Sequence, residues 1–445
     1  MNKRFHGLYP IYKTHRVGIC LFFTGIVILF CSPIQECHGE RIFFAGYNGG
    51  FYIKSEEDGG MALHLGGTFQ TDYRYYTEAE RADNRFDARR ARLRFRGSLT
   101  RWFRYGMQFE FQGNETDNLV DAYGEALYGP HALKFGQFKE PFSLEWQTRD
   151  KALFFSERSM AYSLGPQRDI GAMFHGAIYH DAVNYSVGIF NGDGDDGETG
   201  GSEHDEPELA GRIVLAPFAN AGMDWIRCLQ FGGSATYAQI DLANVDLNVK
   251  STGMYGTDRS LYVLGHDTKF GVLQDVDDRR RLGVEAAWAW GPLLLQGEGV
   301  YLKYTGLKPV GASRMDADFT AGYASATWCL TGEHPVLYRG RVEPLYPKHF
   351  FQPELGTFGA LCLSARVEYF KGDEDWINPE ASVSTEEADA VGVALSWILF
   401  PMVRITLDYC HTAFSDPLRV RVLPNGDVDY IDEENVLPCR FSMDF

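Results

Sequence analysis

The feature that most constrains the fold is a two-residue alternation of apolar and polar side chains over unusually long stretches. In residues 61–75 the odd positions are mostly apolar, from Leu63 to Tyr75, and the even positions are mostly polar, from His64 to Arg74. This period is that of an extended strand, and a soluble strand usually has only about 5–6 residues. The pattern returns in residues 90–99 and 103–112. The chain is therefore predicted to consist of long strands, each with one apolar and one polar face.

Strands of this kind need a partner for their apolar faces. A soluble sandwich covers each apolar face with a second sheet, whereas a closed barrel in a membrane turns it toward lipid and the polar face toward water. Thirteen further segments read as strands, near residues 119–128, 131–139, 169–178, 183–190, 208–217, 228–240, 280–290, 292–304, 318–330, 357–370, 387–399, 402–413 and 436–445. We therefore predict an all-β protein whose residues 61–445 form a 16-stranded antiparallel transmembrane β-barrel.

The predicted connections alternate between short and long. Short ones are expected at 100–102, 129–130, 179–182, 291–292 and 400–401; long, acidic and Gly-rich ones at 191–207, 240–278 and 414–435. Short periplasmic turns and long external loops are the polarity of outer-membrane barrels. The connection 331–355 breaks this rule, and it is either a long periplasmic turn or an unrecognised hairpin.

The N-terminus has the composition of an export signal. Lys3 and Arg4 precede an apolar stretch at residues 17–31, which is shorter than the roughly 20 residues of a spanning helix. Small residues Cys37 and Gly39 place cleavage before Glu40, so residues 1–39 are predicted to be a signal peptide. The alternative is a membrane anchor. Residues 40–60 would then be a short periplasmic segment before the barrel.

Several functional classes are disfavoured. The chain has 60 Asp and Glu against 42 Lys and Arg, a net charge of −18, which argues against nucleic-acid binding. It has no Gly-x-Ser-x-Gly, His-Glu-x-x-His or P-loop motif, so no catalytic residue, metal or cofactor is expected. Beyond the signal, the cysteines are far apart, odd in number and without a Cys-x-x-Cys pair: Cys228, Cys329, Cys362, Cys410 and Cys439. They predict neither a zinc site nor a disulfide framework.

The sharpest chemical feature is a run of arginines in one predicted strand. Arg90, Arg92, Arg94 and Arg96 alternate with apolar residues and should all face the lumen, where Arg104 and Lys134 of later strands would join them. Guanidinium groups about 6.6–6.8 Å apart would allow an anion to move from one to the next. The alternative is a generic basic wall that only shapes the field of the pore. Anion selectivity does not follow from composition, because acidic residues are also predicted to point inward: Glu110, Asp121, Glu125, Glu285, Glu298, Glu368 and Asp408.

Residues 136–145, Gly-Gln-Phe-Lys-Glu-Pro-Phe-Ser-Leu-Glu, resemble the signature of the phosphate-selective porin O/P family. Matching blocks follow in order: Phe155, Glu157-Arg158, residues 168–171, residues 191–194, Gly211-Arg212, Pro217-Phe218 and residues 330–333. The resemblance implies a trimeric outer-membrane channel of 16 strands, with phosphate or polyphosphate as solute in characterised members.

Trimeric porins fold the loop after the fifth strand into the lumen. By that resemblance residues 140–167 are expected to be a constriction loop, with its basic residues near the pore: Lys139, Arg149, Lys151, Arg158 and Arg168. An ordinary surface loop is the alternative. The last strand is amphipathic, with Phe441 on its apolar face, and ends in Phe445, which resembles an outer-membrane assembly signal. The barrel-assembly machinery is therefore an expected partner.

The sequence thus predicts an outer-membrane porin, a water-filled diffusion channel and not an enzyme. Small anions, outer-membrane lipid and two further copies of the chain in a homotrimer are its expected partners. Three alternatives remain open: a non-selective general porin, a phospholipase-like barrel enzyme, and a plugged structural or adhesive barrel.

Overall fold

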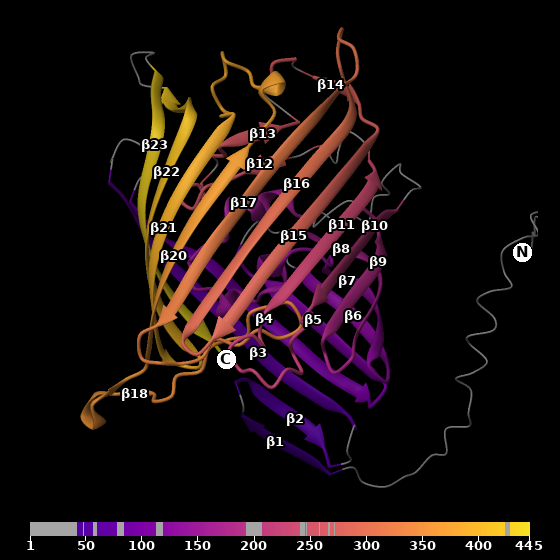
Figure 1. Ribbon diagram of the computed structural model, residues 1–445, viewed down its shortest axis with the longest axis vertical. Helices are drawn as coiled ribbons and strands as arrows, with labels where there is room; N and C mark the ends of the chain where they lie inside the picture. Colours follow the sequence, from indigo (N-terminus) through magenta and orange to yellow (C-terminus); the bar gives the residue numbers. More distant parts are fainter. Residues whose placement is uncertain are drawn as a thin grey trace, which may run out of the picture. The chain divides into compact units, whose positions relative to one another are not determined.

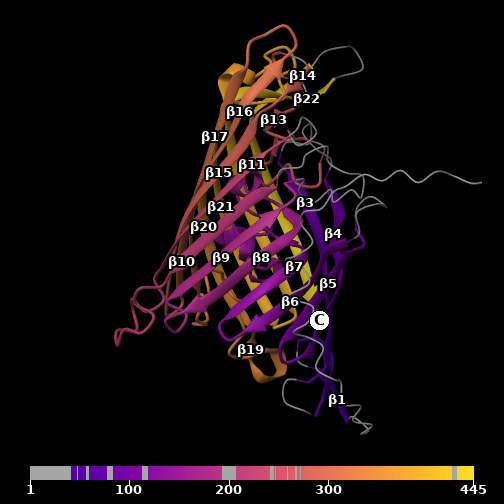
Figure 2. The same ribbon diagram turned by 90° about the vertical axis from the view of Figure 1, so that its right-hand side faces the viewer.

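Sixteen antiparallel strands close into a barrel, as the alternation predicts. Each strand pairs with its neighbours in the chain, and the last pairs with the first from Val436↔Tyr76 to Asp444↔Thr68. Figures 1 and 2 show the barrel from two sides. Its strands are β3 (Ala62–Tyr76), β4 (Arg85–Thr100), β5 (Phe103–Glu110), β6 (Leu119–Tyr128), β7 (His131–Lys139), β8 (Arg168–Ile178), β9 (Val183–Phe190), β10 (Glu208–Leu215), β11 (Gln230–Gln239), β15 (Asp278–Trp290), β16 (Leu293–Pro309), β17 (Met315–Cys329), β20 (Ala360–Lys371), β21 (Glu387–Phe400), β22 (Val403–Val422) and β23 (Val428–Asp444).

The computed structural model describes residues 42–47, 49–56, 60–77, 84–112, 119–192, 207–240, 245, 247–257, 259–265, 268–270, 272–422 and 428–445. The predicted signal peptide and most of the acidic connection 191–207 lie outside these ranges. Within them, no helix combines the length and the apolar character that crossing a membrane requires.

A short hairpin precedes the barrel. Strands β1 (Phe43–Tyr47) and β2 (Phe51–Ser55) pair with each other, and β2 pairs with the start of β3, from Phe51↔Leu65 to Lys54↔Ala62. This pairing begins where that of β23 with β3 stops. Between the two, Gly67 and Phe445 exchange backbone hydrogen bonds of 2.8 and 3.1 Å. The predicted segment 40–60 is thus largely a continuation of the sheet, at the end of the barrel that carries the C-terminus (Figure 1).

The prediction of a long loop at residues 414–435 is wrong. Strands β22 and β23 run through most of it as a tall hairpin. Leu418 and Ile431 are register partners in this hairpin, and both side chains are buried. The hairpin persists because these inward positions pack on other chain segments. The acidic composition of the stretch indicates a solvent-exposed loop instead.

Residues 140–167, which we call the inner loop, lie inside the barrel with a second inserted hairpin. The inner loop contains α2 (Leu144–Gln147), η2 (Asp150–Ala152) and η3 (Met160–Leu164), and the hairpin is β12 (Leu247–Val249) with β13 (Tyr262–Leu264). Both pack on inward apolar side chains of β16, β17 and β20, namely Tyr304, Phe319 and Phe370. An apolar core therefore fills the lumen beside these strands. Strand β14 (Leu273–Asp275) pairs with β16, and η6 (Glu374–Trp376) follows β20.

Residues 331–349, which we call the infolded turn, enter the barrel from the end that carries the short turns. Leu337, Val342 and Leu345 are buried against Ala289 and Leu294 of the wall. After it, β18 (Phe351–Gln352), η5 (Pro353–Leu355) and β19 (Thr357–Phe358) form a small hairpin at the base of the barrel (Figure 1). The irregular connection 331–355 is thus a long turn that includes part of a short hairpin, so each predicted alternative describes one part of it.

The outward positions give a first test of the membrane assignment. Phe95 of β4 and Phe109 of β5 are edge-to-face neighbours, with ring centroids 6.3 Å apart. Changing either Phe95→Arg or Phe109→Arg should lower the free energy of unfolding in bilayers by about 2–4 kcal/mol if the site is near the midplane. Denaturant titration in vesicles, with Phe95→Leu as control, measures this. Parent-like stability of both arginine variants would show that these faces do not meet lipid.

Candidate functional site

The arginine run lies on β4, and a β-bulge changes which side chains face inward. Gln70 pairs with Arg90 but Thr71 pairs with Ala88, so Arg89 is an extra residue in β4. Simple alternation would turn Arg89 outward. Because the bulge resets the register, Arg89 instead reaches Glu157 of the inner loop at 2.8 Å while Arg90 also stays inside.

Arg90 and Arg92, at the start of the run, are paired with carboxylates. Asp150 of the inner loop lies 3.4 Å from Arg90, 2.6 Å from Arg92 and 2.8 Å from Arg158. Arg92 also binds Glu110 at 2.7 Å. Burial would raise the pKa of Asp150, but the guanidinium groups outweigh it and hold that pKa well below its ordinary value. Arg90 and Arg92 therefore serve mainly to hold the inner loop.

A second group of arginines surrounds Glu157. Its carboxylate lies 2.8 Å from Arg74, 2.8 Å from Arg89 and 2.6 Å from Arg440, and Glu157 is buried. Burial raises the pKa of Glu157, but Arg89, Arg440 and Arg74 together lower it well below the ordinary value. Three wall cations thus meet one loop anion.

Inward carboxylates of the wall hold the same loop by its backbone. Glu298 accepts hydrogen bonds from the N–H groups of Leu144 and Glu145, at 2.8 and 2.6 Å. Glu368 accepts one from Met160 at 2.7 Å, and Asp408 accepts one from Ser156 at 2.7 Å. These acidic residues, which looked like pore charges in the sequence, are buried anchors.

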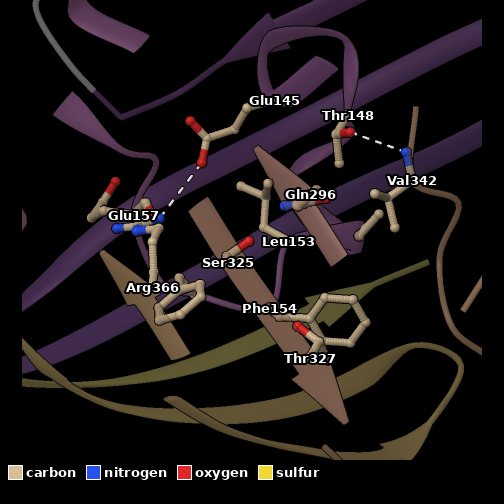
Figure 3. Close-up of a pocket in the computed structure, with 12 residues that line it drawn as sticks. Glu145, Thr148, Leu153, Phe154, Glu157, Gln296, Ser325, Thr327, Val342 and Arg366 are labelled. Atoms are coloured by element: carbon tan, nitrogen blue, oxygen red, sulfur yellow. Dashed lines mark hydrogen bonds and ion pairs between the residues drawn. The ribbon is translucent and has the colours of Figure 1, made fainter. Parts of the chain in front are cut away.

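Figure 3 shows the junction of inner loop, wall and infolded turn around a small cavity. Glu145 of the loop faces Arg366 of β20 at 3.5 Å. On the other side, the Val342 N–H of the infolded turn donates to Thr148 Oγ1 at 3.1 Å. The infolded turn is thus fixed to the inner loop as well as to the wall.

A basic chamber remains on the opposite side of the lumen, toward β4–β10. Its volume is about 430 Å³. The chamber is lined by eight cationic side chains, Arg96, Arg104, Lys134, Lys139, Arg149, Arg212, Arg339 and Arg341. Four tyrosines, Tyr105, Tyr123, Tyr185 and Tyr338, also contribute to its surface.

The chamber has more positive than negative charge. Arg212 pairs with Glu285, Arg339 with Asp181 and Arg341 with Glu343. Among the described residues, no carboxylate lies within ion-pair distance of the other five lining cations, Arg96, Arg104, Lys134, Lys139 and Arg149. Glu125, the one carboxylate in the lining, binds His175 at 2.8 Å. Burial, Arg96 and Arg341 lower the pKa of Arg149 to about 10, so it stays charged at neutral pH.

Three of the predicted loop cations lie around Trp146 of the inner loop. Lys139, Arg158 and Arg168 lie 4.4, 5.8 and 5.2 Å from its ring. Arg168 also pairs with Asp121 at 2.9 Å. The carbonyl of Lys151 accepts a hydrogen bond from Arg404 of the wall.

The other predicted pore residues are distributed as follows. Arg96, Arg104 and Lys134 line the chamber, and Lys134 lies over the Tyr123 ring at 3.7 Å. Arg94 donates to Gln108 at 2.7 Å. Phe441 faces outward on β23 and is exposed.

Sequence reasoning missed the contribution of the infolded turn. Its Tyr338, Arg339 and Arg341 line the chamber, and the Gly340 carbonyl accepts from Arg212 at 2.6 Å. The only feature of the sequence that pointed to this contribution was the unusual length of the connection 331–355.

The Glu157 contacts predict an acid-sensitive fold. Because the folded-state pKa lies below the ordinary 4.5, the stabilisation is present above pH 4.5 and is lost as the pH falls through the folded-state pKa. Glu157→Gln should lower the free energy of unfolding at pH 7 by about 3–5 kcal/mol and flatten its acid limb. Denaturant titrations from pH 7 to pH 3 measure both, with the exposed Glu374→Gln as control. An acid limb as steep as the parent's would contradict this assignment.

The comparison with protein families is decisive here. The family model described as phosphate-selective porin O and P matches residues 63–441. The chain belongs to this family. It is therefore an outer-membrane porin, and the membership supports an anion-preferring channel. No curated protein sequence matches the chain significantly.

Solved structures show the same fold at low sequence identity. OmpT of Vibrio cholerae, folded in vitro, is 9% identical, with a TM-score of 0.52 over 88% of this chain and 99% of that one. An anion-selective porin from Comamonas acidovorans is 12% identical, with a TM-score of 0.51 over 86% of this chain and 100% of that one. The trimer form of the Vibrio cholerae protein is 9% identical, with a TM-score of 0.52 over 87% of this chain and 100% of that one.

Proposed function

We propose that this porin passes small anions in preference to cations, and that the basic chamber is its selective region. The observation that carries the proposal is the set of five lining cations without an ion-paired carboxylate around a cavity of about 430 Å³. Most acidic residues of the lumen lie away from this cavity: Glu298, Glu368 and Asp408 are bound to the inner loop, and Glu125 is the one described carboxylate that lines the chamber.

The arrangement suits transient anion binding. Guanidinium groups remain charged at any physiological pH, and their planar forks match the oxygens of phosphate. Several moderate sites in one chamber allow an anion to enter and to leave, which a single tight site would prevent. Inorganic phosphate is the solute we propose, in line with the description of the family. The anion-selective porin from Comamonas acidovorans shows that this fold accommodates such a preference.

We propose that residues 140–167 act as the constriction, and that the pore-lining path comprises Arg96, Arg104, Lys134, Lys139 and Arg149. Arg90, Arg92, Arg158 and Arg168 support the path by positioning the loop rather than by meeting solute. Arg94, which is hydrogen-bonded to Gln108 and lies two residues before Arg96 on the same face of β4, would extend the path toward the outside.

The working form is proposed to be a homotrimer in the outer membrane, exported by a signal peptide at residues 1–39. The trimer form of the Vibrio cholerae porin supports this assembly for the shared fold.

Phosphate block of chloride current tests the proposed solute. Purified protein in planar bilayers, bathed in potassium chloride at pH 7, should show a current that inorganic phosphate reduces in a saturable manner. Sulfate at the same ionic strength is the control for a divalent anion. A current insensitive to phosphate would overturn the proposed solute and favour a non-selective porin.

A further inference from the structure

Two cysteines that are distant in the sequence are direct neighbours across the sheet. Cys329 ends β17, Cys362 lies near the start of β20, and the two are register partners. The adjacent pair is hydrogen-bonded, because the Leu330 N–H donates to the Leu361 carbonyl at 2.7 Å. Hydrogen-bonded and non-hydrogen-bonded pairs alternate along an antiparallel ladder, so Cys329 and Cys362 form a non-hydrogen-bonded pair.

That position has the geometry of a disulfide. Cα atoms of a non-hydrogen-bonded pair are about 4.5 Å apart, and disulfides span Cα separations of about 4.4–6.8 Å. Both cysteines are free thiols in the structure, and as register partners their side chains lie on the same face of the sheet. Both side chains are fully buried, beneath Leu337 and Val342 of the infolded turn.

The remaining described thiols lack such a partner. Cys410 pairs with Gly392 and Val436, and Cys439 pairs with Leu407 and Tyr73, while Cys228 precedes β11. The sheet register therefore singles out one pair among the five described cysteines, which their spacing in the sequence did not reveal.

We propose that Cys329 and Cys362 form a disulfide bond in the exported protein. The two thiols together lose two protons and two electrons, and one S–S bond forms. The oxidant is a disulfide-bearing protein of the periplasm, whose own S–S bond opens through a mixed disulfide and is reduced to two thiols. The bond forms before the infolded turn covers the pair, since the folded site excludes an oxidant.

The bond would fix one wall of the basic chamber. It closes the chain around residues 330–361, which include the infolded turn with Tyr338, Arg339 and Arg341. A cross-link at the base of a long connection limits the conformations of that connection in the unfolded chain and so favours the folded one. The disulfide therefore keeps the two chamber arginines of this turn in place.

Differential alkylation of the outer-membrane-expressed protein tests the bond. The protein is denatured without reductant, alkylated with iodoacetamide, reduced, alkylated with N-ethylmaleimide and mapped by mass spectrometry. Cys329 and Cys362 should carry only N-ethylmaleimide, whereas Cys228, Cys410 and Cys439 should carry iodoacetamide. Iodoacetamide on Cys329 and Cys362 would overturn the proposal.

A thermal measurement in detergent supplies an independent result. Protein refolded in the presence of reductant should have a melting midpoint several degrees below that of the exported protein. The double variant Cys329→Ala, Cys362→Ala should show no such difference, and Cys410→Ala should keep the full difference. Equal midpoints for the reduced and the exported parent protein would contradict a stabilising bond.

Discussion

Deleting residues 149–158 should raise the single-channel conductance several-fold, because it removes the part of the inner loop that lies between the β4 wall and β22. Asp150 and Glu157 leave with the deletion, and their wall partners, Arg92 and Arg440 among them, then face water. The charges they expose remain solvated, so the barrel should still close. The measurement is single-channel recording in planar bilayers, on protein that runs as a folded species in unheated gels.

A matched control is a deletion outside the lumen. Residues 219–224 lie in the exposed turn between β10 and β11, and their removal should leave the conductance at the parent value. Unchanged conductance after deletion of 149–158, in a folded channel, would mean that the inner loop does not narrow the pore.

Replacing Arg96 and Arg149 by Gln should remove most of the preference for anions. Both line the chamber, and burial next to Arg96 and Arg341 already lowers the pKa of Arg149, so like charges are close there. At an effective dielectric of about 20, like charges within several ångströms of each other repel by roughly 2–4 kcal/mol. An entering anion relieves that repulsion, and the double variant has less of it to relieve. The reversal potential in a salt gradient should therefore move toward that of the cation.

The control for that variant changes the same net charge elsewhere. Arg227 and Arg280 are exposed, and Arg227→Gln with Arg280→Gln should leave the reversal potential unchanged. The difference between the two double variants should be largest at low salt, where the Debye length is longest. Identical reversal potentials for both would place the solute preference outside the chamber.

The barrel was predictable because alternation is a local property. Each of the sixteen strands follows from which side chains can face lipid and which can face water, and the structure confirms every predicted strand. The tall β22–β23 hairpin was missed because its acidic segment resembles a loop. Only the burial of Leu418 and Ile431 against inserted segments explains why it stays extended.

The site was predictable only in part, since charge on a strand face does not reveal its partner. The run at Arg90–Arg96 and the loop after β7 were visible in the sequence, but their division into loop anchors and chamber cations depends on where Asp150 and Glu157 lie. The inward turn of Arg89 depends on a bulge, and the contributions of Arg339 and Arg341 depend on a long connection that folds back. Such contacts join residues far apart in the chain and leave no local pattern.

The reversal potential of the parent channel tests the central claim most directly. Purified protein is placed in a bilayer between a concentrated and a dilute potassium chloride solution at pH 7, and the voltage of zero current is recorded. An anion-preferring chamber predicts a value on the side of the chloride equilibrium potential, and a larger preference when both solutions are diluted. A reversal potential at zero or on the potassium side would contradict the account.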